Sequence, residues 1–267
     1  MDLETVRAYR RATTRDDLAL APGERFVAGG TWLYSEPQVG TTGLVDLTTM
    51  GWAPLEEVDG GLRIGATCTI AELVAHPAWA PYPSHPLVFQ CASALLASFK
   101  IWNAATVGGN VCRSFAAAGM VSLAVTLDGE AVVWAPDGGE LRRPVADLVT
   151  GNGTNDLGAG EVLRAIDLPA HALAARTAFR KIALAELGRS GAVLTGRVDD
   201  DGRATFAITA ATERPTVLRF DRIPDATTLR RAVEDAPGYY TDPLGTADWR
   251  RAVSVALLED VREELAA

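Results

Sequence analysis

The chain has 267 residues, 48% of them hydrophobic and 22% charged, which is the composition of a globular protein with a substantial core. Its 34 acidic residues outnumber its 25 lysines and arginines, and the net charge of −9 argues against a nucleic-acid surface. The N-terminal stretch has no apolar run and no window reaches roughly 18 apolar residues, so we expect neither a signal peptide nor a membrane span. The three cysteines are scattered along the sequence, which predicts free thiols in a reducing cytoplasm. The three histidines are equally scattered, so we expect no metal site.

The N-terminal part of the chain predicts short elements separated by turns. We expect a short helix at 14–21, an apolar strand that runs into a glycine turn at 25–30, and a second strand at 43–50. A further strand ends near Gly65 and leads into a helix that stops at Pro77. Four prolines from that point onward predict an extended passage.

The middle of the chain mixes helical and strand patterns. Residues 87–98 are apolar at helical spacing, and the sequence ATVGGN at 105–110 follows as a predicted loop. The stretch 120–136 predicts a helix or buried segment, a turn and a strand. Another strand with a short helix is expected at 139–149, and a strand at 161–169.

The pattern changes after Pro169. Residues 176–184 and 190–212 alternate apolar and polar side chains, and the sequence DDDG within the second stretch predicts a turn between two strands. The remaining chain predicts helices with solvated faces. We therefore expect an α+β protein in two parts, with a domain boundary near residue 170.

Two glycine pairs stand out as candidate binding elements, AGGTWL at 28–33 and ATVGGNVC at 105–112. Neither has the GxGxxG order of a Rossmann turn or the GK[ST] of a P-loop. A single pair of this kind is most simply a turn, because glycine tolerates positive φ. Two pairs, each beside a threonine, are better explained together as backbone cradles for an anion such as a diphosphate. Asn110 adds a side chain that both donates and accepts.

These motifs carry a resemblance to a known family. In this order, the stretches RFVAGGTWL, GGLRIGATCTIAELV, NAATVGGNV and EVLRAIDLP resemble the FAD-binding medium subunits of molybdenum hydroxylases of the xanthine, carbon monoxide and aldehyde dehydrogenase type. The similarity runs over essentially the whole chain. It implies two α/β FAD-binding subdomains within residues 1–170, split near residue 55. A small C-terminal domain with a three-stranded sheet and helices would occupy residues 171–267.

The resemblance also implies noncovalent FAD and a set of residues that bind it. Each glycine motif would contribute backbone N–H groups to the diphosphate, because FAD lies between the two subdomains. Lys181 would lie on the side of the flavin ring, although a solvated surface charge explains it at least as well. The implied cofactor-binding residues are Ala28, Gly29, Gly30, Thr31, Trp32, Leu33, Thr106, Gly108, Gly109, Asn110 and Lys181.

Three positions depart from the family pattern. Trp32 stands where many relatives have an aspartate, and it is either a core aromatic or part of an altered pocket. We expect Trp102 to be a core residue. Gly119 replaces an aspartate that in relatives contacts a cofactor hydroxyl, so we expect one lost acceptor that an aspartate at this position would restore.

The implied function is electron transfer within a larger enzyme. A small subunit with [2Fe–2S] clusters would deliver electrons to the flavin, a large subunit would carry the molybdopterin cofactor, and the flavin would reduce NAD, a quinone or oxygen. The alternatives are a stand-alone FAD-dependent oxidoreductase acting on a small organic substrate, and a non-redox descendant that binds flavin poorly. We recognise no nucleophile or acid–base motif in the sequence, so we assign no catalytic residues.

Overall fold

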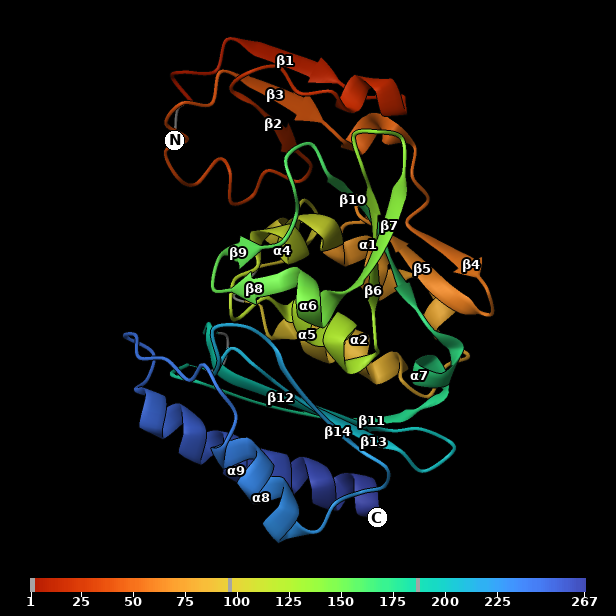
Figure 1. The fold of residues 1–267 in the computed structure, drawn as a ribbon, viewed down its shortest axis with the longest axis vertical. Coiled ribbons are helices and arrows are strands. Elements are labelled where there is room, and N and C mark those ends of the chain that lie inside the picture. The colour runs from red at the N-terminus through yellow and green to blue at the C-terminus, as the bar shows by residue number, and fades with distance from the viewer. Residues whose placement is uncertain (1–2, 96–97, 186–187) are drawn as a thin grey trace.

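The computed structural model describes residues 3–95, 98–185 and 188–267. Three principal β-sheets follow one another along the long axis of the molecule (Figure 1). The N-terminus lies beside the first sheet, and the C-terminus lies at the opposite end, among the last helices. No helix in these three segments is long and apolar enough to cross a membrane.

The first sheet is small and entirely parallel. Its spatial order is β1 (Ala8–Arg11), β3 (Gly43–Asp46) and β2 (Glu24–Val27). The short 3₁₀ helices η1 (Arg15–Leu18) and η2 (Thr48–Met50) lie in the connections that follow β1 and β3. The buried core of this sheet includes Leu18, Val45 and Leu47, and it is completed by Val162 from much later in the chain.

The central sheet has five antiparallel strands. Their order is β4 (Leu55–Val58), β5 (Gly61–Gly65), β10 (Val162–Leu168), β6 (Glu130–Trp134) and β7 (Glu140–Pro144). A two-stranded hairpin, β8 (Val149–Gly151) with β9 (Thr154–Asn155), lies beside it. The helices in this part are α1 (Ile70–Ala75), η3 (Pro77–Trp79), α2 (His85–Ser93), α3 (Phe99–Trp102), α4 (Val107–Arg113), α5 (Gly119–Thr126), α6 (Val145–Leu148) and α7 (Ala170–Ala174).

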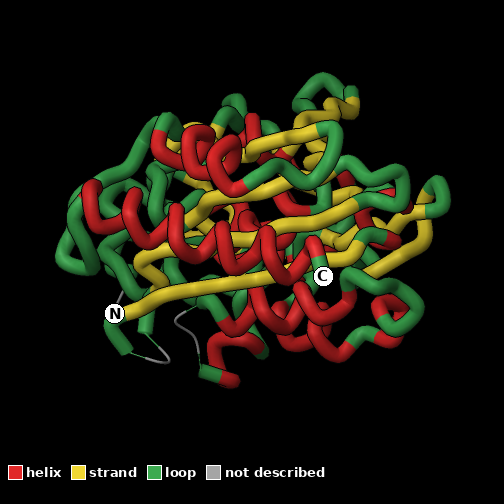
Figure 2. Tube along the Cα trace, turned by 90° about the horizontal axis from the view of Figure 1, so that it is seen from below, coloured by secondary structure: helices red, strands yellow, loops and turns green. Residues whose placement is uncertain are grey.

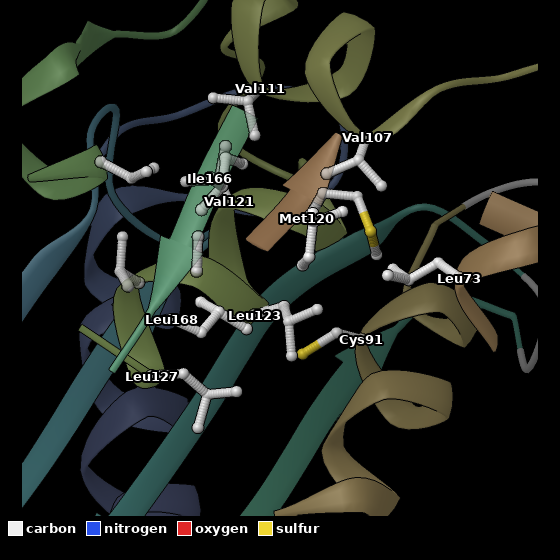
Figure 3. Packing of buried hydrophobic residues seen from close by; sticks show 14 of the residues in the cluster. Leu73, Cys91, Val107, Val111, Met120, Val121, Leu123, Leu127, Ile166 and Leu168 are labelled. Atoms are coloured by element: carbon white, nitrogen blue, oxygen red, sulfur yellow. The ribbon is translucent and has the colours of Figure 1, made fainter. Parts of the chain in front are cut away.

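The largest apolar cluster joins these helices to the central sheet. Val107 and Val111 of α4 point into the same cluster as Met120 of α5 and Ile166 of β10 (Figure 3). Helix α5 is buried along all of its length, as expected for a mostly apolar helix. This packing fixes the position of α4, which carries the second glycine motif.

The C-terminal sheet has four antiparallel strands, β11 (Arg176–Ala183), β12 (Ser190–Val198), β13 (Ala204–Thr209) and β14 (Thr216–Phe220). Helices α8 (Ala226–Glu234) and α9 (Ala247–Ala266) lie over one face of it, and they are in front of the strands in Figure 2. Helix α5 packs against β12 and β13. The sheet has four strands, one more than expected. The additional strand is β14, a short edge strand whose sequence, TVLRF, has too little alternation to be recognised as a strand.

Candidate cofactor-binding site

The first glycine pair forms a tight turn directly after β2. Gly30 has a φ of +65°, which glycine adopts without the strain that other residues would suffer. Gly29 lies against the backbone of Ala104, and a Cβ on this glycine would be 1.8 Å from the Ala104 carbonyl oxygen. Glycine is therefore required here both for the turn and for the close approach of the first sheet to the loop before α4.

This turn leaves a run of backbone donors available. The Tyr34 N–H donates to the Gly30 carbonyl at 2.9 Å and the Ser35 N–H donates to the Trp32 carbonyl at 2.9 Å, which closes the turn. Within the part of the chain that the structure describes, the N–H groups of residues 29–33 donate no hydrogen bond to the protein. Consecutive unpaired N–H groups of this kind attract an anion.

The second glycine pair lies in a helix, so the loop predicted for this stretch is wrong. Helix α4 begins directly after Thr106, whose hydroxyl accepts a hydrogen bond from the Gly109 N–H at 3.1 Å and caps the helix. A Cβ on Gly108 would be 2.5 Å from the Ala66 Cβ. The glycines are tolerated in this helix because its first turn packs directly against the end of β5.

Most backbone donors of the second motif are already engaged. Val107 donates to the Cys68 carbonyl at 2.8 Å, and Gly108 donates to the Ala66 carbonyl at 2.9 Å. Besides capping, the Thr106 hydroxyl can still donate its own proton, since a hydroxyl is both donor and acceptor. The Asn110 side-chain oxygen accepts from the Met120 N–H at 3.0 Å, which leaves the Asn110 amide nitrogen to donate.

The two motifs meet around a cavity of about 480 Å³. A second cavity of about 380 Å³ adjoins it at Gly29 and Thr106, and a third of about 190 Å³ adjoins it at Ala28 and Gly109. Nine of the eleven predicted residues line the main cavity, namely Ala28, Gly29, Gly30, Thr31, Trp32, Leu33, Thr106, Gly109 and Asn110. A cavity with two adjoining cavities beside an anion-binding turn suits a long ligand that contains a phosphate group.

The other two predicted residues lie elsewhere. Gly108 is buried and lines only the third, mostly apolar cavity. Lys181 is on β11, where its Nζ donates to the Ser93 carbonyl at 3.2 Å, and it is not among the described residues that line the three cavities. The structure therefore links Lys181 to α2 and does not bring it to the glycine motifs.

Sequence reasoning missed an arginine at this cavity. The guanidinium carbon of Arg113 is 3.8 Å from the centroid of the Trp32 ring and 4.2 Å from that of Phe115. Arg113 follows Asn110 by three residues, which places both on one face of α4. That spacing would have indicated Arg113, but it has meaning only in a helix, and this stretch was expected to be a loop. Trp32 is thus part of the cavity wall.

The position of Phe115 is fixed by the β8–β9 hairpin. The Gly153 N–H donates to the Ser114 carbonyl at 2.8 Å, and the Ala116 N–H donates to the Asn152 side-chain oxygen at 3.1 Å. Ser114 has a φ of +53°, so the chain turns sharply at the end of α4. Phe115 remains 40% exposed and lines the main cavity.

The thiol in the cavity wall has a raised pKa. Cys112 lines the main cavity, and burial raises the pKa of its thiol to about 12. Since the thiolate is the nucleophile, a thiol with this pKa stays protonated near neutral pH and does not attack a ligand.

The two remaining departures from the family pattern lie outside the main cavity. Gly119 is buried at the start of α5, and a Cβ there would be 2.2 Å from the Cys91 carbonyl oxygen of α2. The expectation that Gly119 marks a lost cofactor contact is therefore wrong, since this position has no room for an aspartate. Trp102 packs against the largest apolar cluster and makes an edge-to-face contact with Phe89 at 6.0 Å between ring centroids, as expected for a core residue.

Comparison with protein families gives one match that covers most of the chain. The model described as the FAD binding domain in molybdopterin dehydrogenase matches residues 4–171. The chain belongs to this family. Two Escherichia coli proteins, from strains K12 and O157:H7, carry names that describe xanthine dehydrogenase FAD-binding subunits. They are 26% and 25% identical to this chain over 227 residues, which cover 79% of the chain and 76% of each relative.

Solved structures show the same fold. A chain of quinoline 2-oxidoreductase from Pseudomonas putida 86 matches with a TM-score of 0.84 at 22% identity, covering 100% of this chain and 98% of that one. A chain of reconstituted CO dehydrogenase from Oligotropha carboxidovorans matches with a TM-score of 0.85 at 21% identity, covering 98% of each chain. These matches confirm the predicted α+β fold.

Family membership confirms two further predictions. FAD is the cofactor, and the chain is an FAD-dependent oxidoreductase. The geometry fits this cofactor, because FAD has a diphosphate between two extended arms. The free N–H groups of residues 29–33 suit the diphosphate, and the adjoining cavities offer room for the rest of the cofactor.

Proposed function

We propose that the chain is the electron-transfer subunit of a molybdenum hydroxylase. It would receive electrons from [2Fe–2S] clusters in a small subunit and pass them from noncovalent FAD to an external acceptor such as NAD, a quinone or oxygen. The observation that carries the proposal is the cavity between the two glycine motifs, with its run of unpaired backbone donors at residues 29–33. The cytoplasmic location expected from the sequence belongs to the same proposal.

The two motifs would bind FAD in different ways. The N–H groups of residues 29–33 would bind the diphosphate, and Thr106 and Asn110 would add one side-chain donor each from the opposite wall. Gly108 and Gly109 would act by allowing close packing of α4, since their N–H groups already have partners. Bound FAD supplies the redox chemistry, and the residues of this chain bind it, orient it and exclude water from it.

The proposed partners follow from the names of the relatives and from the cysteine count. Similar chains are named as FAD-binding subunits of xanthine dehydrogenase, which describes part of a larger enzyme. Even one [2Fe–2S] cluster needs four protein ligands, usually cysteines, and this sequence has three cysteines in all. A separate small subunit would therefore supply the clusters, and a large subunit would carry the molybdopterin cofactor.

A second candidate function is a stand-alone FAD-dependent oxidoreductase. Trp32 favours it, because it places an aromatic ring in the cavity wall at a position where many relatives have an aspartate. Here the cavity would accept a small organic substrate next to the cofactor.

One experiment separates the two candidates. The purified chain is loaded with FAD, and the absorbance of oxidised flavin is followed anaerobically while small organic substrates are added. We expect no bleaching with the chain alone, and bleaching once the reduced iron–sulfur subunit and the molybdenum subunit are added. Bleaching by a substrate without partners would replace the subunit proposal with the stand-alone one. Heat precipitation should release FAD into the supernatant, and flavin retained on the washed pellet would contradict noncovalent binding.

A further inference from the structure

Arg113 is a partly buried cation with no anionic partner in the described structure. Two buried arginines, Arg197 and Arg250, each form an ion pair with an aspartate. Across residues 3–95, 98–185 and 188–267, Arg113 makes neither an ion pair nor a hydrogen bond, and its Nε is buried without a partner. Burying a charge without a counter-charge costs folding free energy, so the position of Arg113 needs a physical explanation.

The surroundings hold Arg113 in place without neutralising it. The guanidinium lies over the ring of Trp32 and over the ring of Phe115, which contact each other edge to face with centroids 6.3 Å apart, and both cation–π contacts are attractive. Burial lowers the pKa of Arg113, against a smaller opposing effect of the charge on Glu36. An arginine nevertheless stays protonated at any physiological pH. The result is a fixed, positively charged group at the cavity.

Apart from Arg113, the described wall of the main cavity holds one cation, Arg25, and its other groups are uncharged or negative. The donors at residues 29–33, Thr106 and Asn110 are all uncharged. Glu24 in the same wall is bound by Arg10, and Arg25 is exposed. A diphosphate carries two negative charges, and backbone donors balance them only in part.

We propose that Arg113 is the cation that pairs with the diphosphate of FAD, held ready for it by Trp32 and Phe115. The inference rests on the proposed function, since it names a residue that acts on the cofactor of the same site. It makes Arg113 a specificity residue, because a flavin without phosphate groups gains nothing from this charge. It also explains why a tryptophan occupies position 32, since its ring supports the arginine on one side.

The test compares FAD with riboflavin, which lacks the diphosphate together with the adenosine attached to it. The flavin-free protein is titrated with FAD and with riboflavin, and binding is followed by the quenching of flavin fluorescence. The variant Arg113→Gln should weaken FAD binding by about tenfold or more, equivalent to about 1.4 kcal/mol, and should leave riboflavin binding within twofold. The control Arg222→Gln removes one exposed positive charge in the C-terminal part and should change neither affinity.

Two results would overturn the assignment of Arg113. One is a folded Arg113→Gln protein that binds FAD with less than a fivefold loss, and the other is an equal loss of FAD and riboflavin affinity. If this variant does not fold, Arg113→Met, which keeps the aliphatic part of the side chain and removes the charge, takes its place. A folded Arg113→Met protein is judged by the same two results, and a loss of FAD affinity below fivefold would again overturn the proposal. A wild-type protein that fails to bind FAD would refute the proposed function itself.

Discussion

Arg197 of β12 and Asp128, in the turn after α5, form a buried ion pair that joins the C-terminal sheet to the helix beneath it. The same guanidinium donates to Asp199 at 2.9 Å and to the Thr126 carbonyl at 2.8 Å. Burial would raise the pKa of Asp128, but the hydrogen bond and charge of Arg197 outweigh it and keep that pKa below its usual value. Both partners therefore stay charged at neutral pH.

This network predicts a large loss of stability for Arg197→Met. The variant leaves the buried Asp199 without its ion-pair partner, whereas Asp128 keeps its ion pair with Arg219, and an uncompensated buried charge costs about 3–5 kcal/mol of unfolding free energy. The matched control is Arg203→Met, which removes an exposed pair with Asp201 and should cost less than about 1 kcal/mol. Urea unfolding measures both, and equal losses for the two variants would contradict the prediction.

The contact between Gly29 and Ala104 predicts that Gly29→Ala damages both folding and binding. The new methyl group would overlap the Ala104 carbonyl oxygen, which is backbone, so the turn and the loop before α4 must separate. We expect a lower melting temperature and FAD affinity reduced by about tenfold or more, since the donors at residues 29–33 move with the turn. Gly158→Ala is the control, because the nearest atoms to a Cβ at this exposed site belong to the Glu161 side chain and lie at 3.3 Å or more. An unchanged FAD affinity in a destabilised Gly29→Ala protein would show that the glycine serves the turn alone.

The hydroxyl of Thr106 predicts that Thr106→Val and Thr106→Ser differ in stability and in FAD affinity. Thr106→Val keeps the shape but loses the hydroxyl that accepts from the Gly109 N–H, and the loss of such a helix cap costs about 1 kcal/mol. It also removes a donor from the cavity, so FAD binding should weaken. Thr106→Ser keeps the hydroxyl and should bind FAD nearly as the wild-type protein does. Thermal melts and FAD titrations of both variants check this, and a serine variant as weak as the valine variant would contradict it.

The ion pair between Arg10 and Glu24 predicts a pH dependence of stability. Hydrogen bonds from Arg10 and from the Ala21 N–H lower the pKa of Glu24 from 4.5 to about 2. Because the folded-state pKa is the lower one, this stabilisation is complete above pH 4.5 and is lost as the pH falls towards 2. Glu24→Gln should therefore melt below the wild-type protein at pH 7, and the difference should shrink as the pH approaches 2.

The control for this pH series is Glu57→Gln, at an exposed site on β4. Its melting temperature should follow that of the wild-type protein at every pH. A constant difference between Glu24→Gln and wild type across the range would show that Glu24 stabilises the first sheet through packing and not through its charge.

Periodicity in the sequence predicted most of the fold. The strands around Gly65 and at 161–169, the helix after Thr69 and the C-terminal helices all follow simple apolar patterns. The strands β1 and β14 have no such pattern, because both are short edge strands with mixed polar residues. The domain boundaries near residues 55 and 170 stay predictions, although each lies between two of the three sheets.

The site was predictable in its location more than in its chemistry. The sequence predicted that both glycine motifs lie at one site, because glycine allows the backbone to approach a ligand closely, and both motifs do line one cavity. The sequence did not reveal that backbone N–H groups of the second motif already donate hydrogen bonds within the protein, since the accepting carbonyls of Ala66 and Cys68 belong to a distant part of the chain. Arg113 was missed for a similar reason, because its partners Trp32 and Phe115 meet it only in the folded protein.

The core of the first sheet has a consequence for folding during synthesis. Its three strands lie within the first 46 residues, but their apolar side chains close against Val162 and Trp134. A chain emerging from the ribosome can therefore pair these strands early but has to leave their inner face uncovered until residue 162 has been added. During that interval the uncovered face is open to molecular chaperones, and a ribosome pause between residues 46 and 162 would prolong the exposure.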